Sequence, residues 1–127
     1  MTKNNLFSGL HHVSLLVSDL QRARSFYINA LGLEEDTSRP EMAFPGMWLK
    51  IGNQQIHLLC FDKTASGTGF KHPGRDAHFA LAVTAISKVE EIMKRIEVPY
   101  HMSKSGRRAL FCRDPDGNGI EFVEIMD

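Results

Sequence analysis

A chain of 127 residues with 43% hydrophobic and 24% charged side chains has the size and composition of one globular domain with a buried core. Its 15 basic residues balance its 15 acidic residues, so bulk charge gives no support to binding of nucleic acid or of an anionic membrane surface. No apolar run approaches the ~20 residues that span a bilayer, and we expect no signal peptide in the polar segment Met1–Asn5. Cys60 and Cys112 are too few for a disulfide framework, which predicts a cytoplasmic protein with reduced thiols.

The first half of the chain predicts a strand, a helix and then further strands. Residues 10–17 alternate between an apolar face that contains Val13 and a second face that contains His12. Asp19 can cap a helix, apolar side chains then recur at helical spacing, and Gly32 ends it. The remaining elements are a loop with a strand fragment and two strands that a turn at Gly52-Asn53 connects: 34–45, 47–51 and 55–61.

The second half predicts the same order after a Gly-rich linker at 62–76. An opening strand at 78–83 leads to a helix that Thr84 caps and that Pro99 follows. Two short strands, a turn with a dense set of turn-forming residues and a last strand complete the half: 100–102, 109–113, 114–118 and 120–126.

The two halves also share sequence. HVSLLV, which begins at His12, corresponds to HFALAV, which begins at His78, and the segment around His57 corresponds to the segment around Glu121. His57 follows His12 by 45 residues and Glu121 follows His78 by 43, with an offset of about 65 residues between the copies. The sequence therefore predicts a duplicated module with metal-binding side chains at equivalent positions.

These four side chains, His12, His57, His78 and Glu121, form the candidate site. Taken singly, each is typical of a hydrogen-bonded polar residue in a core or on a half-exposed strand. Together, imidazole and carboxylate ligands suit zinc, iron, nickel or manganese, and a site without cysteine is more typical of catalysis than of structural metal binding. Strands hold such ligands rigidly, as metal geometry requires.

The chain resembles the vicinal oxygen chelate superfamily, which includes glyoxalase I, bleomycin resistance proteins and extradiol dioxygenases. Three motifs carry the resemblance, which extends from Gly9 to Ile125: His12-Val13-x-Leu15-x-Val17-x-Asp19, Arg24-Ser25-Phe26-Tyr27 followed by Leu31-Gly32-Leu33, and Asp114-Pro115-Asp116-Gly117-Asn118 leading to Glu121-Phe122. It implies an α+β fold of two βαβββ modules whose curled sheets surround a metal site. The expected modules are 9–62 and 77–126, separated by a linker at 63–76, within one domain.

The resemblance also implies that His12, His57, His78 and Glu121 hold one divalent metal ion, zinc, nickel, manganese or iron. Glyoxalase I usually has a glutamate at the place of His57, so Glu121 is the only carboxylate of this set. Extradiol dioxygenases use the positions of His12, His78 and Glu121 alone. The ligand set therefore leaves the chemistry open between members of the superfamily.

We expect a metal-dependent lyase or isomerase of the glyoxalase type that acts on a small substrate with vicinal oxygens, with the metal as Lewis acid. Glu121 is the expected proton shuttle. The alternatives are an extradiol-type dioxygenase and a metal-free small-molecule binding protein.

Further residues are candidates for contact with the substrate. Arg39, Arg75 and Arg107 could bind a carboxylate or phosphate group, and Trp48 could wall an apolar pocket, although solvated charges and ordinary core packing are equally simple interpretations. His11, His72 and His101 have no repeat partner of ligand type and are left out of the site. The edge and concave face of a module of only ~50 residues need a partner, which predicts a homodimer.

Overall fold

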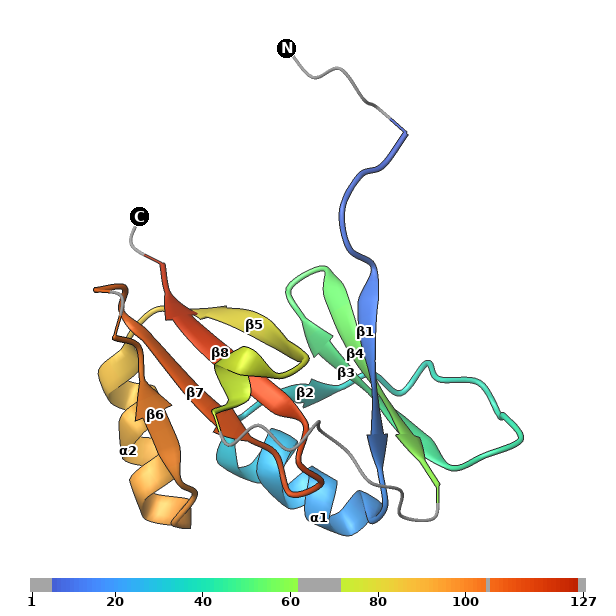
Figure 1. The fold of residues 1–127 in the computed structure, drawn as a ribbon. Coiled ribbons are helices and arrows are strands. Elements are labelled where there is room, and N and C mark those ends of the chain that lie inside the picture. Colours follow the sequence, from blue (N-terminus) through green and yellow to red (C-terminus); the bar gives the residue numbers. More distant parts are fainter. Residues whose placement is uncertain (1–5, 62–71, 105, 126–127) are drawn as a thin grey trace.

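The computed structural model describes residues 6–61, 72–104 and 106–125. Within these ranges the chain forms two four-stranded sheets, one from each half, and no strand pairing joins one sheet to the other. Figure 1 shows the two sheets side by side, with the segment before the first strand projecting away from both. None of the described helices is long and apolar enough to span a membrane.

The first sheet has the strand order β1-β4-β3-β2, in which β1 pairs with β4 in parallel and the other pairs are antiparallel. The predicted helix begins at the Asp19 cap, whose carboxylate accepts hydrogen bonds from the backbone N–H groups of Gln21 and Arg22. It continues into a π-helical turn and ends before Gly32, which has a φ of +83°. The elements are β1 (His12–Val17), α1 (Leu20–Arg24), η1 (Ser25–Ala30), β2 (Glu34–Glu35), β3 (Gly46–Ile51) and β4 (Gln54–Cys60).

The second sheet repeats this arrangement with the order β5-β8-β7-β6, where β5 and β8 are parallel. The predicted internal repeat is therefore confirmed at the level of strand order and direction. The elements are η2 (Pro73–Arg75), β5 (His78–Val83), α2 (Ile86–Ile96), β6 (Tyr100–Met102), β7 (Ala109–Arg113) and β8 (Gly119–Glu124). Most of the predicted linker, residues 62–71, lies outside the described residues.

The cap of α2 differs from the prediction. Ala85, not Thr84, occupies the cap position, and its side chain has no oxygen to accept a hydrogen bond. Instead, Glu124 of β8 accepts the N–H of Ile86 at 2.9 Å. A carboxylate from a distant strand thus supplies the cap, which no local pattern could indicate.

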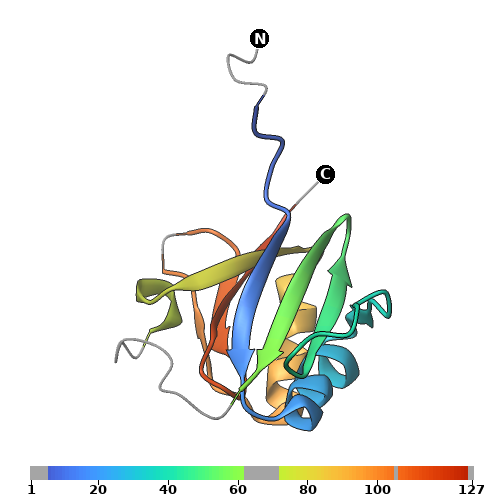
Figure 2. The same cartoon turned by 90° about the vertical axis from the view of Figure 1, so that its right-hand side faces the viewer.

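Strand alternation separates a packed face from an open face in each sheet. Val17, Leu58 and Ile120 are at most 3% exposed and belong to the hydrophobic core with the helices. The opposite face of β1, which contains His12, and that of β5, which contains His78, are exposed. Figure 2 shows both helices toward the lower end of the molecule, and Figure 1 shows α2 beside the strands of the second sheet. The candidate ligands therefore lie on the faces that the core does not use.

The turn at 114–118 connects the two halves. Tyr27 of η1 donates a buried hydrogen bond of 2.7 Å to Asp114 Oδ2, and Ser18 Oγ donates one of 2.7 Å to Asp116 Oδ1. Asn118 Nδ2 donates to the carbonyl of Leu16 on β1 at 3.0 Å. Burial, followed by the charge and hydrogen bond of Asp114, raises the pKa of Tyr27 well above its usual value, so the hydroxyl keeps its proton as a donor. The superfamily-like turn thus contributes to stability.

Asp114→Ala is expected to lower the free energy of unfolding by about 3 kcal/mol or more, because it leaves buried donors without an acceptor. Those donors are the Tyr27 hydroxyl and the backbone N–H groups of Asp116 and Asn118. Asp36→Ala is the matched control, since Asp36 accepts comparable bonds from Ser38 in an exposed turn. Urea unfolding measures both variants, and equal losses would contradict the role of Asp114.

Candidate metal centre

The first sheet brings together His12 of β1 and His57 of β4. Ser14 is directly opposite His57 in the parallel register, so His12 is two residues away along β1 and on the same face. The rings of His12 and His57 stack with centroids 3.9 Å apart, and Trp48 of β3 stacks on the other side of His57 at 4.3 Å. Trp48 thus contacts a candidate ligand and restrains its ring.

The surroundings of His57 favour the neutral imidazole that binds metals. Burial lowers the pKa of His57, and positive charge on His12, His11 and Arg39 lowers it further. His57 Nε2 lies 2.9 Å from Gln55 Oε1, and because an amide oxygen only accepts, Nε2 carries the proton. The lone pair is therefore on Nδ1. His11, which was not among the predicted ligands, also contacts the pair, because its Nδ1 lies 2.9 Å from His12 Nδ1.

The second sheet brings together His78 of β5 and Glu121 of β8. His78 Nδ1 donates to the backbone carbonyl of Asp76 at 2.8 Å, which leaves the lone pair of the neutral ring on Nε2. That atom lies 3.1 Å from Glu121 Oε1, and Glu121 is only 6% exposed. Orientation of a histidine by a backbone carbonyl is typical of metal sites.

This second pair fits a metal ion. An imidazole lone pair and a carboxylate oxygen that face each other require a cation between them, either a proton or a metal. Two ligand atoms with bonds of about 2.0–2.2 Å to one ion lie roughly 3 Å apart, in agreement with the separation of His78 and Glu121. The other oxygen, Glu121 Oε2, is buried without a hydrogen bond, although the guanidinium of Arg107 forms an ion pair with it at 3.0 Å.

The structure thus places the four predicted ligands in two pairs, one on the open face of each sheet. Across the described ranges, no three His, Cys, Asp or Glu side chains are grouped closely enough to hold one metal ion. The complete set of His12, His57, His78 and Glu121 therefore stays a prediction. Each pair contributes two ligands, and the two pairs would have to come together to form one site.

The predicted substrate-contacting residues do not act as one group. Arg39 donates to the carbonyl of Phe44 at 2.8 Å and lies over its ring, so it supports the loop before β3. Trp48 packs on His57. Arg75 and Arg107 line a hollow of about 290 Å³, where Arg107 also pairs with Glu121.

The same hollow contains His72 and Lys104, which the sequence analysis did not select. The ring of His72 contacts His101 at 4.7 Å and Phe111 at 4.9 Å between centroids. His72 and Lys104 have no equivalent ligand in the repeat, and they meet only because the segments before β5 and before β7 converge. The basic character of the segment around Lys104 is visible in the sequence, but no local pattern places Lys104 next to His72.

Residues 9–122 match the family model described as Glyoxalase/Bleomycin resistance protein/Dioxygenase superfamily. The chain belongs to this superfamily. The resemblance inferred from the sequence motifs is therefore confirmed, and so is the α+β fold of two modules, each with one four-stranded sheet, that it implied.

Relatives within the superfamily have several names. Bovine mitochondrial methylmalonyl-CoA epimerase is 40% identical over 91% of this chain and 72% of its own length. Lactoylglutathione lyase of Escherichia coli O157:H7 is 30% identical, with 93% of each protein covered. A chloroplastic Arabidopsis thaliana protein named as a lactoylglutathione lyase is 28% identical, and the chain spans only 35% of its length.

Solved structures of the superfamily share the fold. A Bacillus anthracis protein assigned to the glyoxalase family superposes with a TM-score of 0.72 at 25% identity, over 97% of this chain and 99% of that one. Listeria monocytogenes FosX, a fosfomycin resistance protein, superposes with a TM-score of 0.74 at 20% identity, over 93% and 91%. The second likeness supports the fold alone. The relatives named here include lyases and an epimerase, so they do not identify one reaction for this chain.

Proposed function

We propose that the protein is a metal-dependent lyase or isomerase of the glyoxalase type, which moves a proton on a carbon next to a carbonyl group. The observation that carries the proposal is the pair of His78 and Glu121, in which an imidazole nitrogen and an oxygen of a buried carboxylate lie 3.1 Å apart. The neutral, oriented His57 beside His12 supports a second half of the same site. Lyase and epimerase relatives agree with this class of reaction.

Each residue of the set has a definite role in the proposal. His12, His57 and His78 would hold a divalent ion, and the carbonyl of Asp76 keeps His78 in the tautomer that could bind it. When bound, that ion acts as a Lewis acid for the two vicinal oxygens of the substrate. Glu121 accepts the proton at one carboxylate oxygen and returns it to the neighbouring carbon. Its burial limits the access of water to the carboxylate.

An activity assay tests the proposal directly. The protein, loaded separately with nickel, zinc, manganese or ferrous ion, is expected to isomerise the hemithioacetal of methylglyoxal and a thiol, or to exchange the α-proton of an acyl thioester for deuterium. Protein stripped with a chelator is the control and is expected to be inactive. Cleavage of catechol by the iron-loaded protein, without either proton-transfer activity, would contradict the proposal and favour the dioxygenase alternative.

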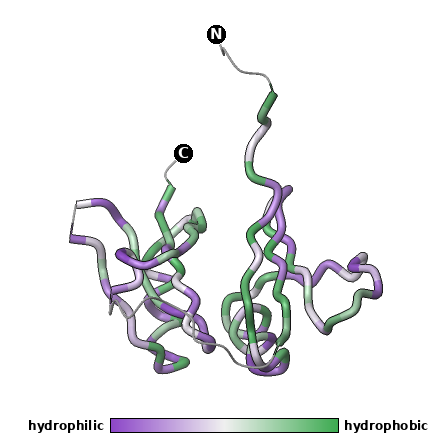
Figure 3. The backbone as a smooth tube through the Cα atoms, turned by 45° about the vertical axis from the view of Figure 1, so that its right-hand side comes forward, coloured by the Kyte–Doolittle hydropathy of each residue, from purple (hydrophilic) through white to green (hydrophobic). Residues whose placement is uncertain are grey.

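We further propose that two copies of the chain complete the site, each supplying one sheet. The open faces with His12 and His78 are exposed, and neither sheet closes on the other. Leu6, Phe7 and Leu10 are 80%, 75% and 81% exposed in the segment before β1, which is large apolar surface for a monomer to leave in water. Figure 3 shows this segment, partly coloured as hydrophobic, projecting away from both sheets.

Sedimentation at micromolar concentration is expected to show a species of twice the 14.3 kDa chain mass. Mixing then tests whether the site is shared. His12→Ala/His57→Ala and His78→Ala/Glu121→Ala chains, each unable to bind metal alone, should regain about a quarter of the wild-type sites after they are unfolded and refolded together at equal amounts. No recovery in a mixture that forms dimers would show that both pairs must come from one chain.

A further inference from the structure

A hollow of about 290 Å³ lies beside the candidate proton shuttle on the second sheet. It is formed by the segment around η2, the segment that precedes β7 and one side chain of β7 itself. The lining residues, here called the basic pocket, are His72, Gly74, Arg75, Ser103, Lys104, Arg107 and Phe111. Arg107 connects the pocket to the site, because its guanidinium lies 3.0 Å from Glu121 Oε2. Phe111 is directly opposite Glu121 in the antiparallel register of β7 and β8.

All charged side chains that line the basic pocket are positive. Arg75, Lys104 and Arg107 are cations at neutral pH, and its described lining contains no acidic residue. A second hollow, of about 440 Å³, shows the contrast: it contains Arg22 and Arg113. There Asp116 lies 3.5 Å from Arg22, and Asp76 lies 3.1 Å from Arg113.

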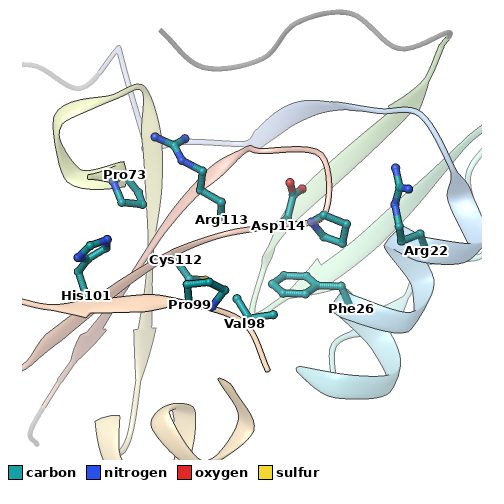
Figure 4. A pocket seen from close by; sticks show the side chains of 10 residues that line it. Arg22, Phe26, Pro73, Val98, Pro99, His101, Cys112, Arg113 and Asp114 are labelled. Carbon is teal, nitrogen blue, oxygen red and sulfur yellow. The ribbon is translucent and has the colours of Figure 1, made fainter. Parts of the chain in front are cut away.

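Figure 4 shows that second hollow, with Phe26, Val98 and Pro99 grouped between the two arginines and Asp114 among the labelled side chains. Its arginines are neutralised by built-in carboxylates, as expected for structural ion pairs. In the basic pocket Arg107 is paired in the same way, with Glu121. Among the described residues neither Arg75 nor Lys104 has a carboxylate partner, so an anion from outside would find these two charges uncompensated.

His72 adds a directed donor to this charge. Its Nδ1 accepts the N–H of Gly74 at 2.9 Å, so the neutral ring carries its proton on Nε2 and can donate that proton to an anion. Burial lowers the pKa of His72, and the positive charges of His101, Arg75 and Lys104 lower it further, which agrees with a positive potential inside the pocket.

Gly74 keeps the pocket open. A Cβ atom at this position would lie 2.9 Å from Phe111 Cε1, closer than real Cβ atoms approach, and 3.0 Å from His72 Cε1, which is tighter than most real contacts. A larger residue would therefore push the aromatic rings that line the pocket.

We propose that the basic pocket binds a doubly charged oxyanion group of the substrate, a phosphate ester or a pair of carboxylates. The two cations Arg75 and Lys104, together with one N–H donor, exceed what a single carboxylate needs, and arginine and lysine together are typical of phosphate binding. The placement of this group beside Glu121 rests on the proposed function, because it puts the reacting carbon of the same molecule near the proton shuttle. Anion binding itself stands on the pocket alone.

Titration calorimetry with inorganic phosphate and with succinate, on metal-free protein, tests the proposal. Wild-type protein is expected to bind at least one of them, and Arg75→Gln/Lys104→Gln should weaken the affinity by about 10-fold or more, since the variant loses both charge-assisted hydrogen bonds to the anion. Lys88→Gln, on the exposed surface of α2, is the matched control and should bind as the wild type does. Tighter binding of phosphate than of succinate would identify a phosphate ester, and the reverse a dicarboxylate.

Equal anion affinity in the wild type and the double variant, or no binding of either anion, would overturn the proposal. Metal binding is measured on the same protein preparations, so a failure of the basic-pocket proposal can be distinguished from a failure of the proposed metal enzyme. Loss of anion affinity in the variant, in a protein that binds no metal, would support the basic pocket and count against the proposed metal enzyme. Metal binding by a protein whose anion affinity the double variant does not change would support the proposed metal enzyme and count against the basic pocket.

Discussion

Glu121→Gln is expected to lose about 10²–10⁴-fold in turnover, the range that general acid–base groups typically contribute. The amide cannot accept and return a proton, yet its oxygen can still coordinate a metal ion, so part of the metal affinity should remain. The buried position of Glu121 and the short separation of its Oε1 from His78 Nε2 make it the carboxylate of the set that can serve both roles. Steady-state kinetics with metal-saturated protein measures the loss.

His57→Gln is the control for this variant, because it removes one of several ligands and no base. It should reduce metal affinity with a much smaller effect on turnover at saturating metal. Full turnover in Glu121→Gln, or an equal loss in both variants, would exclude Glu121 as the proton shuttle.

A divalent metal ion is expected to raise the stability of the protein strongly. An ion present at 1,000 times its dissociation constant stabilises the native state by about 4 kcal/mol, which raises the thermal midpoint. The combined change of His12, His78 and Glu121 to alanine should abolish this rise. The fold should survive the change, since His12 and His78 are on the exposed faces of their strands and outside the hydrophobic core.

Thermal unfolding with and without zinc, nickel, manganese or ferrous ion tests this expectation, with circular dichroism to confirm that the variant is folded. His101→Ala is the control, because it removes an exposed imidazole of β6 that belongs to neither ligand pair, and its metal response should be unchanged. A wild-type midpoint that none of the four ions moves would contradict the metal site.

The sequence by itself determined the two modules and the faces of their strands. Strand alternation is a local property with a period of two residues, so the exposed side of β1 with His12 and of β5 with His78 could be predicted from neighbouring residues alone. The internal repeat then predicted that β4 and β8 occupy equivalent places, and the strand orders of the two sheets confirm this. The helix start at Asp19 follows from the chemistry of one side chain.

Only the tertiary structure decided which of these side chains meet. It pairs His57 with His12 and Glu121 with His78, on two sheets between which no strands pair. It also replaced the predicted cap at Thr84 with the carboxylate of Glu124. These contacts join residues that are tens of positions apart in the chain, and their energy depends on distances that the packing of whole elements sets. Local sequence patterns indicate the conformation of each segment, but they do not show which other segment it packs against.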